Sequence, residues 1–191
     1  CFSIFIVSII IRAYYLGKSG NTYHSKNCNL LYKEKKVGRS LYRRELNKIG
    51  AEILDLGLEV GCVALIHGTK TGKGKVIGLR ADMDALPMND LSGKPWSSKV
   101  DGVAHTCGHD AHTACLLAAA KALMDNRDKF CGTVKLIFQP AEETFAGAKY
   151  MIAHGAMEHP AMDVLTSLHG TPAYHLGQYA IASGKIMASA D

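Results

Sequence analysis

The feature that most constrains this chain is a short polar segment, His105–His112, that leads directly into an apolar one. The polar segment holds three histidines, a cysteine and an aspartate, and the apolar run Cys115–Met124 follows. This order predicts a loop that opens a buried helix and is held rigidly against a core. Cysteine sulfur and histidine nitrogen suit zinc, and also manganese, cobalt or nickel where carboxylates join them. A solvated, histidine-rich loop is the alternative interpretation.

The chain's positive charge is concentrated in one part of the sequence. The 191 residues are enough for one domain with its own core, and their formal net charge is +5. Residues 12–48 contain ten Lys or Arg and two Asp or Glu, so they carry +8 and the remainder carries −3. No nucleic-acid-binding motif accompanies this basic stretch, so we interpret it as a solvated face and expect neither a nucleic-acid nor a membrane partner.

The cysteines and the first residues bear on the cellular compartment. The six cysteines form no CxxC pair, which favours free thiols and a reducing, cytoplasmic location. Residues 1–11 are apolar but shorter than the roughly 20 residues of a membrane span. They match the apolar core of a signal peptide in length, and a secretory signal therefore stays open although no charged region precedes them. Residues 12–39 show no periodicity and predict a loop or disordered linker.

Beyond residue 40 the apolar pattern alternates between helix and strand. We predict a helix over 40–56, capped by Ser40 and stopped by Gly57, and a second helix that Asp110 caps and that ends near Met124. A third helix is predicted over 141–154. The predicted strands are 60–66, 76–81, 133–138 and 163–168, with a turn at 68–75 and a loop at 88–104. This order predicts an α/β sheet with helices on its faces.

Polar residues follow three of the predicted strands at the point where each strand ends. Asp82 and Asp84 follow one strand, Glu142 and Glu143 a second, and His169 a third. Ligands of open α/β sheets bind at the carboxyl ends of the strands. We therefore expect these side chains to meet Cys107 and His109 and to form a metal site.

The adjacent carboxylates Glu142 and Glu143 are the second informative feature. Neighbouring side chains point in different directions, so one can bind a metal while the other faces a substrate. A metal lowers the pKa of bound water, and a nearby carboxylate can take the proton. The alternative is an acidic pair that opens a helix and is favoured there by the helix dipole.

Four segments together resemble one enzyme family. Gly78–Pro87, His105–Asp110, Phe138–Glu143 and Leu168–Gly170 occur in the order found in the metal-dependent amidohydrolases. These include hippurate hydrolase, N-acyl-amino-acid amidohydrolase and indoleacetyl-amino-acid hydrolases, and they are related to aminoacylase and carboxypeptidase metallopeptidases. The resemblance covers roughly residues 50–191, including the closing segment Gly184–Asp191. It implies a zinc-exopeptidase-like three-layer α/β domain with a mixed, mostly parallel sheet and helices on both faces.

The resemblance also implies roles for individual residues. One or two divalent ions, zinc or manganese, would be held by Cys107, His109, Glu143 and His169. Glu142 would be the general base that activates water and then protonates the leaving amine. Asp84 would orient a neighbouring group beside the metal.

The remaining histidines and Cys115 receive simpler interpretations. We expect His105 and His112 to make supporting hydrogen bonds or packing contacts near the site. Cys115 is expected to be a small buried hydrophobic residue on the central helix. Surface or helix-end positions are expected for four further histidines: His67, His154, His159 and His175.

The chain departs from the family pattern at both ends. Residues 1–40 lack the family's His-Pro-Glu-type segment. The lid domain, which carries the dimer surface and a substrate-binding histidine, would follow Asp191, as would a last metal-binding histidine. The resemblance therefore implies that 41–191 are the first part of a catalytic domain without its lid, with homodimers in the full-length family. We expect weakened metal affinity and little activity from this part alone.

Three functions remain open at this stage. The first is hydrolysis of the amide bond of N-acyl amino acids, giving a carboxylic acid and a free amino acid. The second is a non-catalytic metal-binding or interaction fragment that keeps only the fold. The third is a thiol hydrolase in which Cys107 is the nucleophile and His109 or His105 the base.

Overall fold

The computed structural model describes residues 37–173, 175, 178, 180 and 181. The predictions made for residues 1–36 and for the segment Gly184–Asp191 lie outside these residues. No helix in the described part of the chain has the length and apolar character needed to cross a membrane.

The described chain contains the predicted helices and strands in the predicted order. Its elements in order are α2 (Val37–Ile49), β1 (Glu52–Ile53), β2 (Cys62–His67), β3 (Lys75–Asp82), α3 (His109–Asp125), the 3-10 turn Arg127–Lys129, β4 (Gly132–Gln139), α4 (Gly147–Ala153) and β5 (Val164–Ser167). The four predicted strands are therefore present with ends shifted by one or two residues, and the two-residue strand β1 is additional.

The strands form one mixed sheet in the order β1-β2-β4-β3-β5. β3 runs parallel to both β4 and β5, whereas β2 is antiparallel to β1 and β4. Parallel neighbours need crossover connections, and helices supply them here: α3 joins β3 to β4, and α4 joins β4 to β5. The parallel half of the sheet is therefore the part built from β-α-β units.

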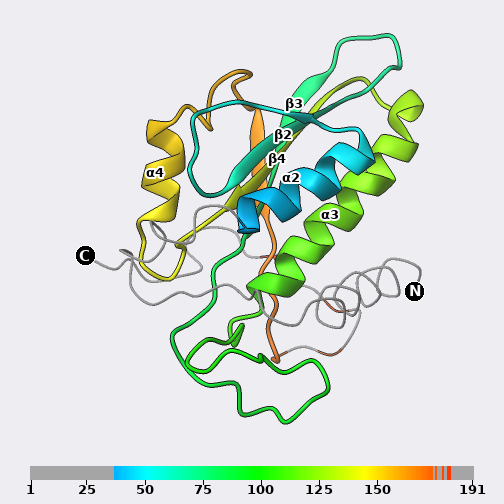
Figure 1. Cartoon of the computed structure of the whole chain (residues 1–191). Helices are drawn as coiled ribbons and strands as arrows, with labels where there is room; N and C mark the ends of the chain where they lie inside the picture. Colours follow the sequence, from blue (N-terminus) through cyan, green and yellow to red (C-terminus); the bar gives the residue numbers. More distant parts are fainter. Residues whose placement is uncertain (1–36, 174, 176–177, 179, 182–191) are drawn as a thin grey trace.

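Helices cover both faces of the sheet, which confirms the expected three-layer arrangement. Figure 1 shows α2 and α3 on one face and α4 beside the other. Alternate residues of each strand serve the two faces, because successive strand side chains point in opposite directions. In β2, Cys62, Ala64 and Ile66 pack with the α2–α3 side, while Val63 packs with Met151 of α4.

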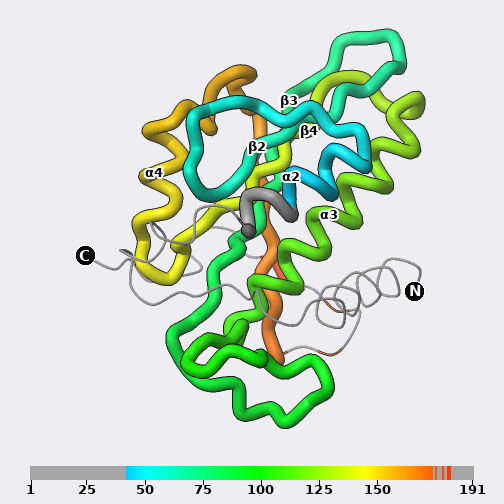
Figure 2. The backbone as a smooth tube through the Cα atoms, viewed as in Figure 1, coloured from blue at the N-terminus to red at the C-terminus, as the bar shows by residue number. Residues whose placement is uncertain are grey.

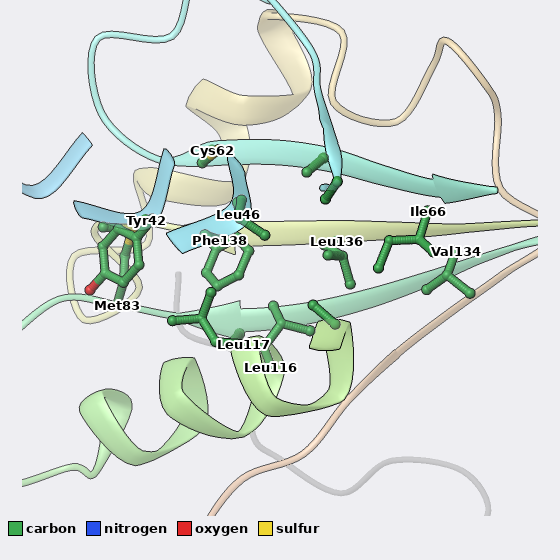
Figure 3. Close-up of a cluster of buried hydrophobic side chains, with 14 residues drawn as sticks. Tyr42, Leu46, Cys62, Ile66, Met83, Leu116, Leu117, Val134, Leu136 and Phe138 are labelled. Atoms are coloured by element: carbon green, nitrogen blue, oxygen red, sulfur yellow. The ribbon is translucent and has the colours of Figure 1, made fainter. Parts of the chain in front are cut away.

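The larger core lies between the sheet and the helices α2 and α3 (Figure 3). Leu46 of α2 and Leu136 and Phe138 of β4 are fully buried in it. The rings of Tyr42 and Phe138 stack with centroids 5.5 Å apart. Burying one such side chain contributes about 1.5–3 kcal/mol, so this layer fixes the position of α3 against the sheet.

The α3 sequence buries one face of the helix. Thr113, Leu116, Leu117 and Ala120 are buried at the spacing of a helix stripe. The prediction that Cys115 is buried was wrong, because Cys115 lies off this stripe and is exposed. The prediction that Asp110 caps the helix was also wrong: Gly108 occupies the cap position, and Asp110 lies in the first turn.

The predicted helix over 40–56 is wrong at both ends. α2 begins at Val37, so Ser40 lies inside it, and it ends at Ile49. Gly50 follows with a φ of 87°, a left-handed conformation that stops the helix. The apparent helical spacing continued by chance, since Ile53 belongs to strand β1 and Leu56 packs on the opposite face of the sheet.

Candidate metal centre

The site lies where the adjacent strands β3 and β4 end. The chain after β3 leads to α3 on one face of the sheet, whereas the chain after β4 leads to α4 on the other face. A crevice opens at the carboxyl ends of two parallel strands whose connections leave in opposite directions. Figure 2 shows the chain leaving β3 and β5 toward this same end of the sheet.

A sharp turn before α3 supplies Cys107 and His109. Gly108 between them has a φ of 87°, a conformation that glycine adopts without strain. His109 is then the first residue of α3 and is fully buried. The hydroxyl of Thr113, one turn further on, donates to the main-chain carbonyl of Asp82 over 2.9 Å. This contact ties the start of α3 to the end of β3.

The turn after β4 supplies Glu142 and Glu143. The expected helix over 141–154 is wrong in its first turn and a half, because α4 begins only at Gly147. Ala141 and Phe145 have φ values of 50° and 57°, which no right-handed helix contains. The two glutamates therefore lie in a tight turn between two left-handed residues rather than on a helix.

This turn is closed by a contact that only glycine allows. The N–H of Gly147 donates to the carbonyl of Ala141 over 3.0 Å. A Cβ atom at position 147 would lie 1.5 Å from the carbonyl oxygen of Pro140. The small residue at 147 thus fixes how closely α4 approaches the end of β4, and with it the position of the glutamates.

Asp84 links these two turns. Its Oδ1 lies 3.2 Å from Nδ1 of His109, and its Oδ2 accepts the main-chain N–H of Glu143 over 3.1 Å. A carboxylate on one ring nitrogen of a histidine leaves the other nitrogen to face a metal, an arrangement common in metal sites. Asp84 therefore occupies a place suited to the orienting role that the resemblance implied.

The structure brings together all four residues predicted as metal ligands and the predicted base. Sγ of Cys107 lies 3.3 Å from Nε2 of His169. Nε2 of His109 lies 3.8 Å from Oε2 of Glu142 and 3.7 Å from Oε1 of Glu143. In two overlapping groups the potential ligand atoms all lie within 4.8 Å of one another: Cys107, His109 and His169, and His109, Glu142 and Glu143.

Two buried atoms in these groups fit a site for a cation. No described residue offers a hydrogen-bond partner to Nε2 of His109 or to Oε1 of Glu143. A buried polar atom without a partner costs about 1–3 kcal/mol. A divalent cation would satisfy both atoms, and the sulfur, nitrogen and oxygen donors here match the ligands of zinc.

The charges at the site favour a cation as well. Burial opposes the charged form of His109, but the Asp84 hydrogen bond and the charges of Asp82, Asp84 and Glu143 outweigh it, so the pKa of His109 is raised. Burial also opposes the charge on Asp84, yet hydrogen bonds from His109 and the Glu143 and Glu142 main chain hold the Asp84 pKa below its usual range. The charged side chains around His109 and Asp84 therefore favour positive charge at this site.

The surroundings of Cys107 argue against a nucleophilic thiol. Burial and the neighbouring carboxylates of Glu143, Glu142 and Asp82 raise the pKa of the Cys107 thiol to about 11. A thiol that stays protonated at neutral pH is a poor nucleophile. Its sulfur also contacts His169 rather than either histidine named as base in the thiol-hydrolase hypothesis.

Four further histidines lie at the surface or at a helix end, as the sequence predicted. His67 and His159 are exposed, and His154 ends α4 with its Nδ1 2.8 Å from the carbonyl of Tyr150. His175 is exposed too. His105 is largely buried, and this burial lowers its pKa.

The sequence placed Asp82 at the metal site with no specific partner, and the structure buries it almost fully there. Asp82 joins Arg80, Nη1 of which lies 2.8 Å from Oδ2, and His112, Nδ1 of which lies 2.6 Å from Oδ1. One signal was available: Arg80 and Asp82 are two apart in a strand and so share a face.

Comparison with known proteins agrees with this arrangement. The model of peptidase family M20/M25/M40 matches residues 78–186, which include the last five residues of β3 and all of α3, β4, α4 and β5. The chain therefore belongs to the M20/M25/M40 peptidase family, and the resemblance to metal-dependent amidohydrolases is confirmed.

Individual relatives share substantial sequence identity with the chain. Thermostable carboxypeptidase 2 of Saccharolobus solfataricus is 43% identical over 169 residues, which are 87% of this chain and 42% of that protein. N-acetyl-L-cysteine deacetylase of Bacillus subtilis is 39% identical over 161 residues, which are 84% of this chain and 38% of the relative. The chain spans about two fifths of the length of these curated relatives.

A solved structure extends the similarity to the fold. The Bacillus subtilis YxeP protein, described as a dinuclear metal binding peptidase from the M20 family, superposes with a TM-score of 0.70 at 33% identity. The match covers 90% of this chain and 44% of that one. That a structural neighbour in this family is described as metal binding agrees with the candidate metal centre of this chain.

Proposed function

We propose that this chain carries the catalytic centre of a metal-dependent hydrolase that cleaves the amide bond of N-acyl amino acids. One observation carries the proposal. Potential ligand atoms from the ends of β4 and β5 and from the start of α3 form two groups that share His109, and within each group the atoms lie within 4.8 Å of one another. The described residues offer no partner to two buried atoms of these groups, Nε2 of His109 and Oε1 of Glu143.

We assign the ligands as Cys107, His109, Glu143 and His169, for one or two divalent ions. Zinc or manganese suits this mixture of sulfur, nitrogen and oxygen donors. When bound, the cation supplies a Lewis acid that polarises the amide carbonyl and lowers the pKa of water.

The chain's own residues then handle the protons. Glu142 is half-buried beside His109 and has one oxygen 3.8 Å from Nε2 of that histidine. As general base it takes a proton from the attacking water, and it then gives this proton to the nitrogen of the departing amino acid. Asp84 holds the ring of His109 and the main chain of Glu143 in place throughout.

The substrate class rests on the relatives. One relative is named as a deacetylase of N-acetyl-L-cysteine and another as a carboxypeptidase. Both names describe cleavage of an amide bond next to an amino acid. A linear amide with a free carboxylate is therefore the substrate that we propose for this chain.

Paired substitutions of the two glutamates test the assignment. Glu142→Gln should leave zinc affinity nearly unchanged and reduce hydrolysis of N-acetyl amino acids by about 100-fold or more, since general-base catalysis contributes about 10²–10⁴-fold. Glu143→Gln should instead weaken zinc binding. The measurements are isothermal titration with zinc and release of free amino acid.

The outcomes separate the three functions. If the chain binds zinc and Glu142→Gln changes neither the zinc affinity nor the release of free amino acid, the non-catalytic alternative holds. If activity survives chelation and depends on Cys107 alone, the thiol hydrolase holds. Activity of the 191-residue chain is expected to be low, because His169 and the strand β5 before it are exposed here, so one side of the site is open to water.

A further inference from the structure

A buried polar network lies directly behind the metal centre. Arg80 and Asp82 of β3 and His112 of α3 form it, and we call it the Asp82–His112 network. Arg80 Nη1 donates to Oδ2 of Asp82 over 2.8 Å, and its Nε donates to Oε1 of Gln139 over 2.9 Å. The side chains of Asp82 and His112 are only 1% and 9% exposed. The network therefore runs from the centre of the sheet to the first turn of α3.

The protonation of His112 follows from its two partners. The main-chain N–H of Gly170 points at Nε2 of His112 over 2.8 Å. An amide N–H can only donate, so Nε2 must be an acceptor and carries no proton. The ring proton is then on Nδ1, which donates to Oδ1 of Asp82 over 2.6 Å. Asp82 thus selects the tautomer that can accept from Gly170.

This acceptor holds the residue that follows His169. Gly170 is engaged on both sides: its N–H donates to His112, and its carbonyl oxygen lies 2.7 Å from Nδ1 of His169. The second contact places the His169 proton on Nδ1 and leaves Nε2 directed at Cys107. The rings of His112 and His169 also meet edge to face, with centroids 4.7 Å apart. His112 therefore contacts the ring of His169 and the backbone that directly follows this residue.

The surroundings of His169 show why bracing is needed. All four residues of β5 are exposed, and Leu168 is 80% exposed. His169 and Gly170 are exposed as well. Little apolar burial fixes this segment, so its described anchors to the buried part of the protein are polar ones.

Asp82 and His112 could themselves be taken for metal ligands, because their atoms lie within 4.8 Å of a nitrogen of His109. Their hydrogen bonds argue against this. Both oxygens of Asp82 and both nitrogens of His112 already have partners at 2.6–2.8 Å. A cation bound there would break these bonds and would lie near the Arg80 guanidinium, which repels it.

We propose that Asp82 and His112 are positioning residues: Asp82 fixes the tautomer of His112, and His112 holds Gly170 and the ring of the ligand His169 in place without touching the metal. This inference rests on the proposed function, in which His169 is a ligand. In this arrangement Arg80 of β3 holds Asp82, and the exposed ligand His169 is supported from the sheet through His112.

The tautomer can be measured in the full chain without any metal. Nitrogen-15 NMR of the histidine rings should show His112 with its proton on Nδ1. It should show the same for His169. In the variant Asp82→Asn the His112 ring should become a mixture of tautomers. A His112 ring that is doubly protonated, or protonated on Nε2, at neutral pH in the wild-type chain would overturn the proposal.

Two replacements of His112 separate positioning from packing. Glutamine can place its Oε1 near the position of Nε2 and keep the bond from Gly170, whereas asparagine reaches only the position of Nδ1. His112→Asn should therefore weaken zinc binding by about 10- to 100-fold, the usual effect of losing such a supporting residue. His112→Gln should weaken it much less. His154→Gln is the control, because the ring of His154 also makes a hydrogen bond, to the carbonyl of Tyr150, but His154 caps the end of α4.

The results distinguish failure of this inference from failure of the proposed function. If the two His112 variants bind zinc equally well, or lose thermal stability with no change in zinc affinity, His112 is a packing residue and the inference is wrong. If the wild-type chain does not bind zinc, the proposed function fails. In that case the ring-nitrogen shifts of His169 in His112→Asn still decide whether the network holds this histidine.

Discussion

Oδ2 of Asp84 accepts the main-chain N–H of Glu143 over 3.1 Å, so the carboxylate at the end of β3 holds the turn at the end of β4. Its other oxygen faces His109. Asp84→Asn keeps the shape of the side chain, but its amide N–H would then face either Nδ1 of His109 or the main-chain N–H of Glu143. We expect zinc affinity to fall by about 10- to 100-fold. Competition with a chromophoric chelator measures this, and Asp101→Asn in an exposed loop should have no effect.

Metal removal should destabilise the protein. A ligand at 100 times its Kd raises the free energy of unfolding by about 2.7 kcal/mol. Thermal melts of chelator-treated chain, with and without added zinc or manganese, should therefore differ, and Cys107→Ser should shrink the difference. His159→Ala, at an exposed histidine, is the matched control. Equal stabilisation of wild type and Cys107→Ser would point to binding elsewhere.

Gly147→Ala should disturb the glutamate turn. The added methyl would meet the Pro140 carbonyl at 1.5 Å, so α4 or the turn must move. Overpacking of this kind costs about 1–3 kcal/mol or more, and we expect zinc affinity to fall with it. Gly57→Ala tests the specificity of the effect, because its methyl has open space and only the φ of 65° is unfavourable. Urea unfolding and zinc titration of both variants decide the matter.

Lys135 should make stability depend on alkaline pH. It is fully buried on β4, and its Nζ donates to the carbonyls of Glu158 and Pro160. Burial lowers the Lys135 pKa, which the Glu158 charge only partly opposes. The unfolded chain then binds the proton more tightly, so the free energy of unfolding rises with pH between the folded pKa and the ordinary value of about 10.4.

Substitution of Lys135 tests this dependence. Lys135→Met should remove the rise in the free energy of unfolding that Lys135 causes. Lys149→Met, which replaces an exposed residue on α4, should keep this rise. Urea unfolding from about pH 8 to about pH 10.5 measures the slopes. Identical slopes in wild type and Lys135→Met would contradict the expectation.

The sheet was largely predictable from the sequence, while the helix ends were not. Buried strands such as β2 are apolar runs bounded by turn residues, and this pattern leaves little ambiguity. α2 and α4 differ because their limits depend on backbone conformation at Gly50, Ala141 and Phe145. An alanine with a φ of 50° gives no signal in the sequence, since tertiary contacts impose this conformation.

The sequence predicted which side chains meet at the site, but not all of the contacts that support them. Cys107, His109, Glu143 and His169 follow strands or open a helix, and strand ends converge by rule in such sheets. The contact between Asp82 and His112 joins residues 30 apart. It depends on how α3 crosses β3, and the hydrophobic pattern does not specify that angle.

The exposed edge strand β5 has a consequence for how the protein responds to its ion. Only β3 pairs with β5 among the described strands, over the four registered pairs from Ile77 with Val164 to Arg80 with Ser167. A cation bound by both His169 and Cys107 would link this edge of the sheet to the start of α3. Amide hydrogens of β5 should then exchange with deuterium rapidly in the metal-free chain and slowly in the loaded one, while those of β4 remain protected in both.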